Sequence, residues 1–238
     1  MIVAAQALEE FFSWRGGKFG SGERARLRIC GRSAQVQSWG KHSMMIAGVT
    51  GNIGCGKSTV SRLFERRGFR RLDSDALVHE RVLTAPEVIS ALLERYGAVV
   101  LKADGSVDRM VLGQRVFGHD GERLWIEGLT HPRVFALWRE AFAGNPTDRW
   151  AVEVPLLFEK ALENWFDFTI CVACSPAQQL ARLEQRGLPR GLAEQRISKQ
   201  LPLAQKIERS DYVIWNEGSP AFLEAEVDRL VNVFAASA

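Results

Sequence analysis

The stretch Gly51-Asn-Ile-Gly-Cys-Gly-Lys-Ser58 decides the fold of this chain, because it matches the pattern G-x-x-x-x-G-K-[ST] of a phosphate-binding loop at every fixed position. The apolar run Met45–Thr50 before it predicts a buried strand, and Val60, Leu63 and Phe64 after it follow helical spacing. Glycines allow successive backbone N–H groups to point at one anion, and a helix N-terminus adds partial positive charge. The segment therefore predicts a site for a nucleoside triphosphate rather than a structural turn.

Two side chains at the end of this loop carry the expected chemistry. Lys57 can reach the outer phosphates of the nucleotide, and the hydroxyl of Ser58 can coordinate Mg²⁺. We expect the nucleotide to be bound by the loop and the first turn of the helix, namely Asn52, Ile53, Gly54, Cys55, Gly56, Lys57, Ser58 and Thr59.

Short apolar runs alternate with helical patterns along the rest of the chain. Further strands are predicted at Phe69–Leu72, Trp150–Val154, Phe168–Ala173 and Asp211–Trp215. Because such alternation favours a parallel sheet covered by helices on both faces, the predicted fold class is α/β with a sheet of the P-loop NTPase type. The mostly helical residues 76–149 interrupt the alternation and predict an insert on this core.

Within the insert, the spacing of apolar residues predicts four helices, at Glu87–Tyr96, Arg109–Phe117, Gly121–Leu129 and Arg133–Ala143. We expect His131-Pro132 to shape the start of the last helix, because proline suits the first turn. The alternative is that His131 contacts a substrate.

Asp73 and Asp75 follow the second predicted strand, and ligands of open α/β sheets bind at the carboxyl ends of the strands. A carboxylate there can orient an acceptor hydroxyl, take its proton or hold Mg²⁺ through water, whereas the alternative is a helix cap. We expect Asp75 to be functional and leave both roles open for Asp73. Val152-Glu-Val-Pro155 lacks a strand-terminal Asp of the Walker B kind, and no Asn-Lys-x-Asp is present to read guanine.

Basic side chains gather late in the chain. Arg182 and Arg186 lie four residues apart on a predicted helix, before a glycine-flanked break at Gly187–Gly191. Further basic residues follow at Arg190, Arg196 and Lys199. The pattern predicts a lid whose guanidinium groups approach the transferred phosphoryl group, and the alternative is a solvated helix face.

The composition is that of an ordinary globular chain, with 238 residues of which 46% are hydrophobic and 25% charged. No apolar run has the length of a membrane-spanning helix, and the first residues lack the basic region of a secretory signal. The four cysteines do not form the pattern of a disulfide framework, which favours a reducing, cytoplasmic location. We expect Cys171 and Cys174 to be buried packing thiols rather than a metal or redox pair.

Residues 1–43 have a different texture, rich in Gly, Ser and Arg, and they carry the chain's excess of positive charge. The net charge of +3 therefore gives no argument that the rest of the chain binds nucleic acid. We interpret the segment as an N-terminal extension that is disordered or lies before the native start, with a transit peptide as the alternative.

In their order along the chain, several segments resemble the dephospho-coenzyme A kinase family, from about Met45 to Asn216. These segments are Gly48–Thr59, Leu72–Asp75 with His79, Asp108-Arg109, Leu112, Val116-Phe117, His131-Pro132, Val154–Glu159, Gln179–Arg186, Arg196 with Gln200, and Ser210–Asn216. The string Val154-Pro-Leu-Leu-Phe-Glu159 is the most specific of them.

The resemblance implies that the chain phosphorylates the ribose 3′-hydroxyl of dephospho-CoA with ATP and Mg²⁺, the last step of coenzyme A synthesis. It implies a nucleotide-binding core over residues 44–75, 150–185 and 210–238, a CoA-binding insert over 76–149 and a lid over 186–209. It also implies a monomer or weak oligomer that has a small-molecule substrate and no nucleic-acid or membrane partner.

Carried over residue by residue, the resemblance assigns roles to individual side chains. Asp75, Lys57 and Arg182 would be catalytic, and Ser58 would hold the metal. Arg186 and Asn216 would join the nucleotide site. The substrate-side candidates, besides Asp75, are His79, Arg115, His131 and Glu159.

Two positions depart from the family pattern, and residues 1–43 have no counterpart in the family's usual start. Asn52 stands where glycine is common, and asparagine tolerates positive φ better than other side chains do. Trp215 stands before Asn216 where a small polar or acidic residue is usual, which bears on the adenine side of the site. The alternatives are a nucleoside or nucleotide kinase with the same core and a slowly hydrolysing regulator that uses residues 1–43 as a nucleic-acid arm.

Overall fold

The computed structural model describes residues 44–116 and 119–236. Residues 1–43, which we interpret as an N-terminal extension, lie outside this part of the chain. So does Phe117, the last residue of the helix predicted at Arg109–Phe117. The described residues form two compact units, which are treated separately here. One unit comprises residues 44–73 and 145–236, and the other is Ser74–Gly144.

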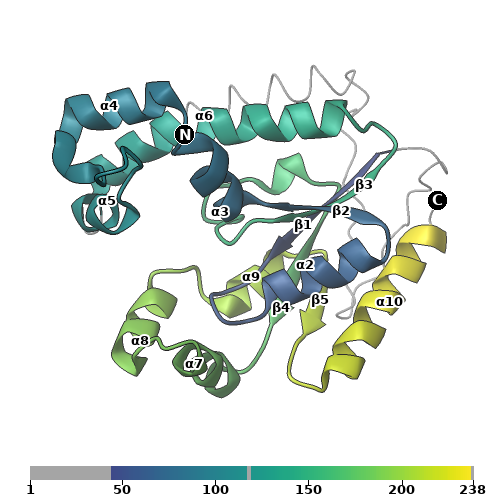
Figure 1. Cartoon of the computed structure of the whole chain (residues 1–238). Helices are drawn as coiled ribbons and strands as arrows, with labels where there is room; N and C mark the ends of the chain where they lie inside the picture. Colours follow the sequence, from purple (N-terminus) through teal and green to yellow (C-terminus); the bar gives the residue numbers. More distant parts are fainter. Residues whose placement is uncertain (1–43, 117–118, 237–238) are drawn as a thin grey trace. The chain divides into compact units, whose positions relative to one another are not determined.

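The first unit contains a five-stranded, all-parallel sheet with the order β2-β3-β1-β4-β5 (Figure 1). Its strands are β1 (Met45–Thr50), β2 (Phe69–Asp73), β3 (Arg149–Glu153), β4 (Phe168–Ala173) and β5 (Tyr212–Trp215). All residues of β1 and β4 are buried, as expected when both faces of a parallel sheet are covered. The predicted α/β sheet of the P-loop NTPase type is confirmed.

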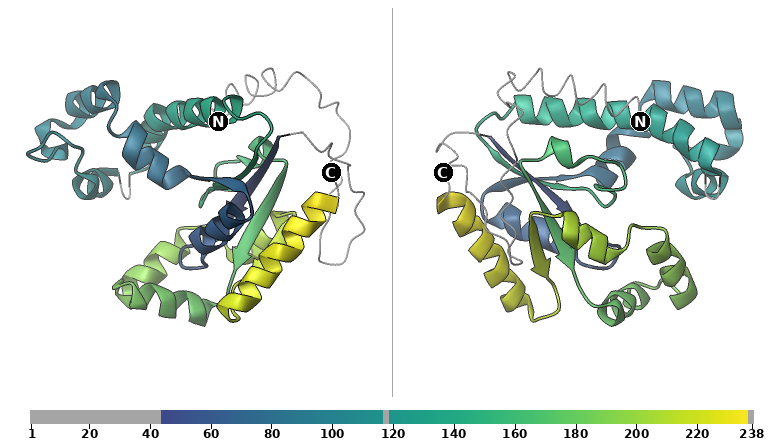
Figure 2. Two further views of the ribbon diagram at one scale, coloured as in Figure 1. Left: turned by 45° about the vertical axis from the view of Figure 1, so that its right-hand side comes forward. Right: turned by 180° about the vertical axis from the view of Figure 1, so that it is seen from behind.

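The helices of this unit follow the strands. They are α2 (Lys57–Arg66), α7 (Pro176–Gln185), α8 (Arg190–Ser198), α9 (Leu203–Arg209) and α10 (Pro220–Ala236), with a 3₁₀ turn at Glu163–Trp165. Ser175 caps α7, because its hydroxyl accepts a hydrogen bond from the backbone N–H of Gln178. Both views in Figure 2 show α7 and α8 beside each other at one end of the unit.

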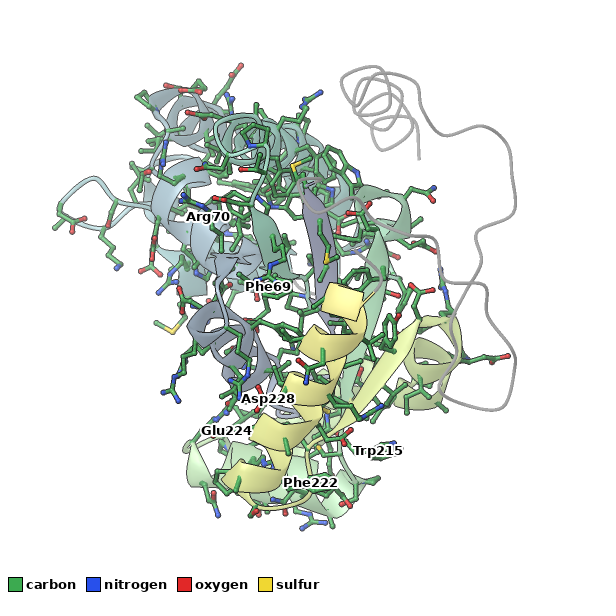
Figure 3. The ribbon with its side chains drawn as sticks, turned by 90° about the vertical axis from the view of Figure 1, so that its right-hand side faces the viewer. Phe69, Arg70, Trp215, Phe222, Glu224 and Asp228 are labelled. Atoms are coloured by element: carbon green, nitrogen blue, oxygen red, sulfur yellow. The ribbon has the colours of Figure 1, made fainter. Side chains whose placement is uncertain are left out.

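The larger core lies between one face of the sheet and the helices α2 and α10, which run alongside each other (Figure 1). Phe234 of α10 packs against Phe168 of β4, with ring centroids 4.2 Å apart. Figure 3 shows Glu224 and Asp228 following one another along α10. Arg67, just after α2, donates to the carboxylate of Asp228 and to the carbonyl of Glu224, which ties the two helices together at the surface.

Residues on the opposite face of the sheet contact the segment after β3. A side-chain carbon added to Gly48 would lie 2.7 Å from the ring of Phe166 and 2.8 Å from Leu157, so this strand position requires a glycine. Helix α9 packs on β4 and contributes the fully buried Lys206 to this side. The second layer therefore comes from an irregular segment and one short helix.

The second unit is helical. It contains α3 (Ser74–Leu77), a π-helical turn (Val78–Val82), α4 (Pro86–Tyr96), a 3₁₀ turn (Ala98–Val100), α5 (Arg109–Val116) and α6 (Asp120–Ala143). The guanidinium group of Arg95 stacks on Trp125 at 4.5 Å and pairs with Glu122 at 2.8 Å, which links α4 to α6. The hydrogen bonds from Arg95 and Tyr96 lower the pKa of Glu122 to about 2.

The prediction of two helices separated at His131-Pro132 is wrong, because α6 continues through Pro132. Proline in a helix interior removes one backbone hydrogen bond. On either side of this position, Thr130, Val134, Phe135 and Trp138 are buried, so packing holds the helix continuous despite the missing bond.

Candidate active site

The glycine loop leaves β1 at Thr50 and enters α2 at Lys57. Gly51, Gly54 and Gly56 have φ angles of 137°, 84° and 98°, which side chains rarely adopt. An added side-chain carbon would also lie 2.2 Å from the carbonyl oxygen of Val172 at Gly51, and 2.1 Å from Nδ2 of Asn216 at Gly56. The loop therefore requires glycine both for its backbone angles and for its close neighbours.

Asn52 needs no special tolerance of positive φ. Among the described residues, Ala161 is the one non-glycine residue with a positive φ, so Asn52 has an ordinary backbone conformation. The expectation that asparagine supports a left-handed conformation here is wrong, because the neighbouring glycines supply the turn.

The ammonium group of Lys57 folds back across the loop. Its Nζ donates to the carbonyl oxygen of Asn52 at 3.2 Å, and its side chain is largely buried. A cation fixed at this point, beside the N-terminus of α2, gives the loop the positive charge that an anionic ligand requires.

Glu153 was not among the residues predicted from the sequence, although it is central to the arrangement. The hydroxyl of Ser58 donates to Oε1 of Glu153 at 2.8 Å, and Glu153 is buried as the last residue of β3. In the parallel register Glu153 is paired with Val49 of β1 and Asp73 of β2, so its position is fixed from both sides. The sequence does indicate Glu153, because an acidic residue within an apolar strand is unusual. The Walker B pattern does not identify it, because that pattern requires an Asp at the end of the strand.

Asp73 lies on the neighbouring strand. Arg71 donates to Oδ2 of Asp73 at 2.8 Å and to Oε2 of Glu153 at 3.4 Å. One guanidinium group thus holds two carboxylates at the carboxyl edge of the sheet, where α/β proteins bind their ligands. Asp75 follows two residues later in α3, with an exposed side chain, and belongs to the helical unit.

Arg182 and Asn216 meet at the carbonyl oxygen of Cys55, within the loop. Asn216 Nδ2 donates to this oxygen at 2.9 Å, and Arg182 Nη1 lies at 3.5 Å. Arg182 Nη2 also donates to the carbonyl oxygen of Asn216 at 2.7 Å. Two of the predicted site residues are therefore brought together on the glycine loop, although they come from α7 and from the end of β5.

The other candidates of the sheet-containing unit lie farther along the chain. Arg186 is exposed immediately after α7. Glu159 accepts hydrogen bonds from Lys206 Nζ at 2.8 Å and from the backbone N–H of Leu201 at 2.9 Å. Trp215 is 49% exposed and Phe222 is 50% exposed, and Figure 3 shows both rings near the end of the unit where α10 begins.

Three further candidates lie in the helical unit with Asp75. His79 contacts Arg109, with Nδ1 of the ring 2.8 Å from Nη1 of the guanidinium group. Arg115 is exposed on α5, and His131 lies half-buried on α6 with its ring 5.8 Å from that of Phe135.

The cysteines of the described residues are buried free thiols, as predicted for Cys171 and Cys174. Cys174 donates to Cys55 across a sulfur–sulfur distance of 3.5 Å. This hydrogen bond, with the charge of Lys57, lowers the pKa of Cys55 to about 7, whereas burial raises the pKa of Cys171 to about 12.

Comparison with known proteins gives a consistent result. The family model described as dephospho-CoA kinase matches residues 45–221. The dephospho-CoA kinase of Thermosynechococcus vestitus is 42% identical over 184 residues, covering 76% of this chain and 91% of the relative. That of Anaeromyxobacter dehalogenans is 37% identical over 194 residues, covering 79% and 91%.

Solved structures agree with this fold. A Thermus thermophilus protein superposes with a TM-score of 0.70 at 32% identity, covering 80% of this chain and 98% of that one.

Among the helices of the described residues, none combines the length and the apolarity that crossing a membrane requires.

The crowding at Gly56 predicts the effect of adding one methyl group. We expect Gly56→Ala to weaken binding of ATP by roughly tenfold or more, because a left-handed alanine costs about 1–2 kcal/mol before the contact with Asn216 is relieved. Isothermal titration calorimetry measures the affinity. Gly191→Ala is the matched control, because Gly191 lies in α8 with open space around it. Equal affinity of Gly56→Ala and wild type would contradict the description of the loop.

Proposed function

The chain belongs to the dephospho-CoA kinase family, and on that premise we propose how its own residues carry out the transfer of phosphate from ATP to dephospho-CoA, the last step of coenzyme A synthesis. The observation that carries the proposal is the hydrogen bond from the hydroxyl of Ser58 to the buried carboxylate of Glu153. Beside it, the ammonium group of Lys57 donates to the carbonyl oxygen of Asn52 in the glycine loop. This arrangement supports phosphoryl transfer rather than simple anion binding, because it provides oxygen ligands for a metal beside the cation for the phosphates.

The glycine loop binds the phosphates of ATP. Backbone N–H groups of the loop and of the N-terminus of α2 are the donors for phosphate oxygens. Asn216 supports the loop by holding the carbonyl oxygen of Cys55. The exposed ring of Trp215 is available to the adenine base.

The hydroxyl of Ser58 would hold Mg²⁺ directly, and the carboxylates of Glu153 and Asp73 would hold it through water. Mg²⁺ prefers oxygen ligands and keeps part of its water shell, and these three side chains offer an oxygen set at the edge of the sheet. When bound, the ion neutralises charge on the outer phosphates. The burial of Glu153 keeps its carboxylate in a single position.

Arg182 and Arg186 stabilise the transferred phosphoryl group. Arg182 already lies on the loop through Cys55 and Asn216, so its guanidinium needs little displacement to face a phosphate. Arg186 is exposed at the end of α7, and its contribution requires movement of the lid over residues 186–209.

Asp75 orients the ribose 3′-hydroxyl of dephospho-CoA and accepts its proton as the hydroxyl oxygen bonds to the γ-phosphorus of ATP and the bond from that phosphorus to the leaving ADP oxygen breaks. His79, Arg115, His131 and Glu159 are the further substrate-side candidates, and residues 76–149 are the part that takes CoA. The free cysteines support a reducing, cytoplasmic setting, in which the enzyme acts as a monomer or weak oligomer with no nucleic-acid or membrane partner.

A coupled assay of ADP release tests this function. We expect dephospho-CoA to stimulate ADP formation from ATP, while adenosine and other nucleosides give only the background rate. Lys57→Ala should abolish the stimulated rate, because it removes the cation of the loop. Absence of stimulation by dephospho-CoA, or a near-normal rate for Lys57→Ala, would contradict the proposal.

The role of Asp75 predicts a specific kinetic signature. Asp75→Asn should lower kcat by roughly a hundredfold or more and leave the KM for ATP within about twofold, since general-base and positioning effects act on the transfer step. Steady-state kinetics with both substrates measure the split. Asp104→Asn, in an exposed turn of the same unit, is the matched control. Equal losses in kcat and in ATP affinity would rule the role out.

The role of Glu153 predicts a change in metal dependence. Glu153→Gln keeps an oxygen to accept the hydrogen bond from Ser58 but removes the charge. The Mg²⁺ concentration for half-maximal activity should therefore rise several-fold, and activity should recover at high Mg²⁺. Glu94→Gln, on the exposed side of α4, should behave as wild type. An unchanged Mg²⁺ requirement would remove Glu153 from the metal site.

A further inference from the structure

Ile53 lies in the middle of the glycine loop, and both of its backbone polar groups are bound by side chains. Its N–H donates to Oε1 of Gln200 at 2.8 Å. Its carbonyl oxygen accepts a hydrogen bond from Nε2 of Gln179 at 2.6 Å. Two glutamines, separated by twenty-one positions in the sequence, therefore hold one residue of the loop from its two sides.

These glutamines stand at the two ends of the arginine-bearing segment. Gln179 is buried on α7, three residues before Arg182 and therefore on a neighbouring part of the same helix face. Gln200 is the second residue after α8, four residues beyond Arg196. Since α7 and α8 pack against each other (Figure 2), the stretch from Gln179 to Gln200 leaves and returns to the same residue of the loop.

The chain around Gln179 and the chain around Gln200 are each fixed by contacts within the unit that contains the sheet. The residue after Gln200, Leu201, donates its backbone N–H to Glu159, which also pairs with the fully buried Lys206. Lys206 in turn donates to the carbonyl oxygen of Pro155 at 2.8 Å. On the other side, a side-chain carbon added to Gly54 would lie 3.1 Å from the backbone of Gln179, so the loop rests directly on α7.

The chemistry requires an amide at each position. A backbone N–H can only donate and a backbone carbonyl can only accept, so Gln200 uses its oxygen and Gln179 uses its nitrogen. Fixing both groups of Ile53 sets the direction of the peptide that leads into Gly54. The orientation of the following peptide groups of the loop depends on that direction, because the loop is short and its glycines impose no preference of their own.

We propose that Gln179 and Gln200 are positioning residues that hold Ile53 jointly, so that the arginine-bearing segment between them sets the affinity of the loop for the phosphates of ATP. The inference rests on the proposed function, since it assigns the loop to ATP. Glu159 and Lys206 support it by fixing the chain at Leu201, which gives Glu159 a structural role beside its place among the substrate-side candidates.

The test is a double-mutant cycle on the full chain with direct measurement of ATP binding. Gln179→Met and Gln200→Met keep the length of each side chain and remove the hydrogen bond. Each should raise the Kd for ATP between roughly fivefold and thirtyfold, as expected for losing a partner of a partly buried backbone group. Because both act through Ile53, the double variant should lose much less than the product of the two single effects.

Two further readouts separate positioning from general destabilisation. The KM for ATP should rise with little change in the KM for dephospho-CoA, and the loss of ATP affinity should persist at a temperature well below the thermal midpoint of each variant. Gln178→Met and Gln195→Met are the controls, because these glutamines are exposed on α7 and α8. They should bind ATP as wild type does.

Unchanged ATP affinity in either single variant, or effects that multiply in the double variant, would overturn the inference. The outcome is distinct from failure of the proposed function. A wild-type protein that binds ATP but is not stimulated by dephospho-CoA would contradict the substrate, while the binding cycle would still decide the roles of Gln179 and Gln200.

Discussion

The backbone between Thr50 and Lys57 has to leave a fully buried strand, turn through three glycines with positive φ and enter a helix whose first residue is the loop's lysine. A peptide chain follows this path only where side chains are absent at the crowded points, because a carbon at Gly51 or Gly56 would meet Val172 or Asn216. The N–H groups exposed by the turn form the anion site, and the rest of the site is arranged around this curl.

The order of the strands provides the neighbours of the loop. With β3 and β4 on either side of β1, the carboxyl edge brings Glu153 from one side and the helix carrying Arg182 from the other. Each contributes a different charge, so a buried carboxylate and a guanidinium group flank the same loop. This distribution suits a ligand that carries both negative phosphates and a bound cation.

The residues between α7 and α9 gain their role from contacts with this loop rather than from their own charges. Arg186, Arg190 and Arg196 are exposed and would be ordinary surface residues in isolation. The hydrogen bonds of Gln179 and Gln200 to Ile53 connect the two ends of this stretch with the glycine loop.

The sequence by itself determined the glycine loop, the parallel α/β sheet, the buried thiols and the family, since these depend on local patterns of glycine, apolar residues and short ordered motifs. Only the tertiary structure revealed Glu153, the two glutamines on Ile53 and the continuous helix through Pro132. The partners of Glu153 and Gln200 lie about a hundred residues or more away in the sequence, so no local pattern specifies them. For Pro132, the local preference for a break was outweighed by burial of the side chains around it, which is a property of packing and not of sequence spacing.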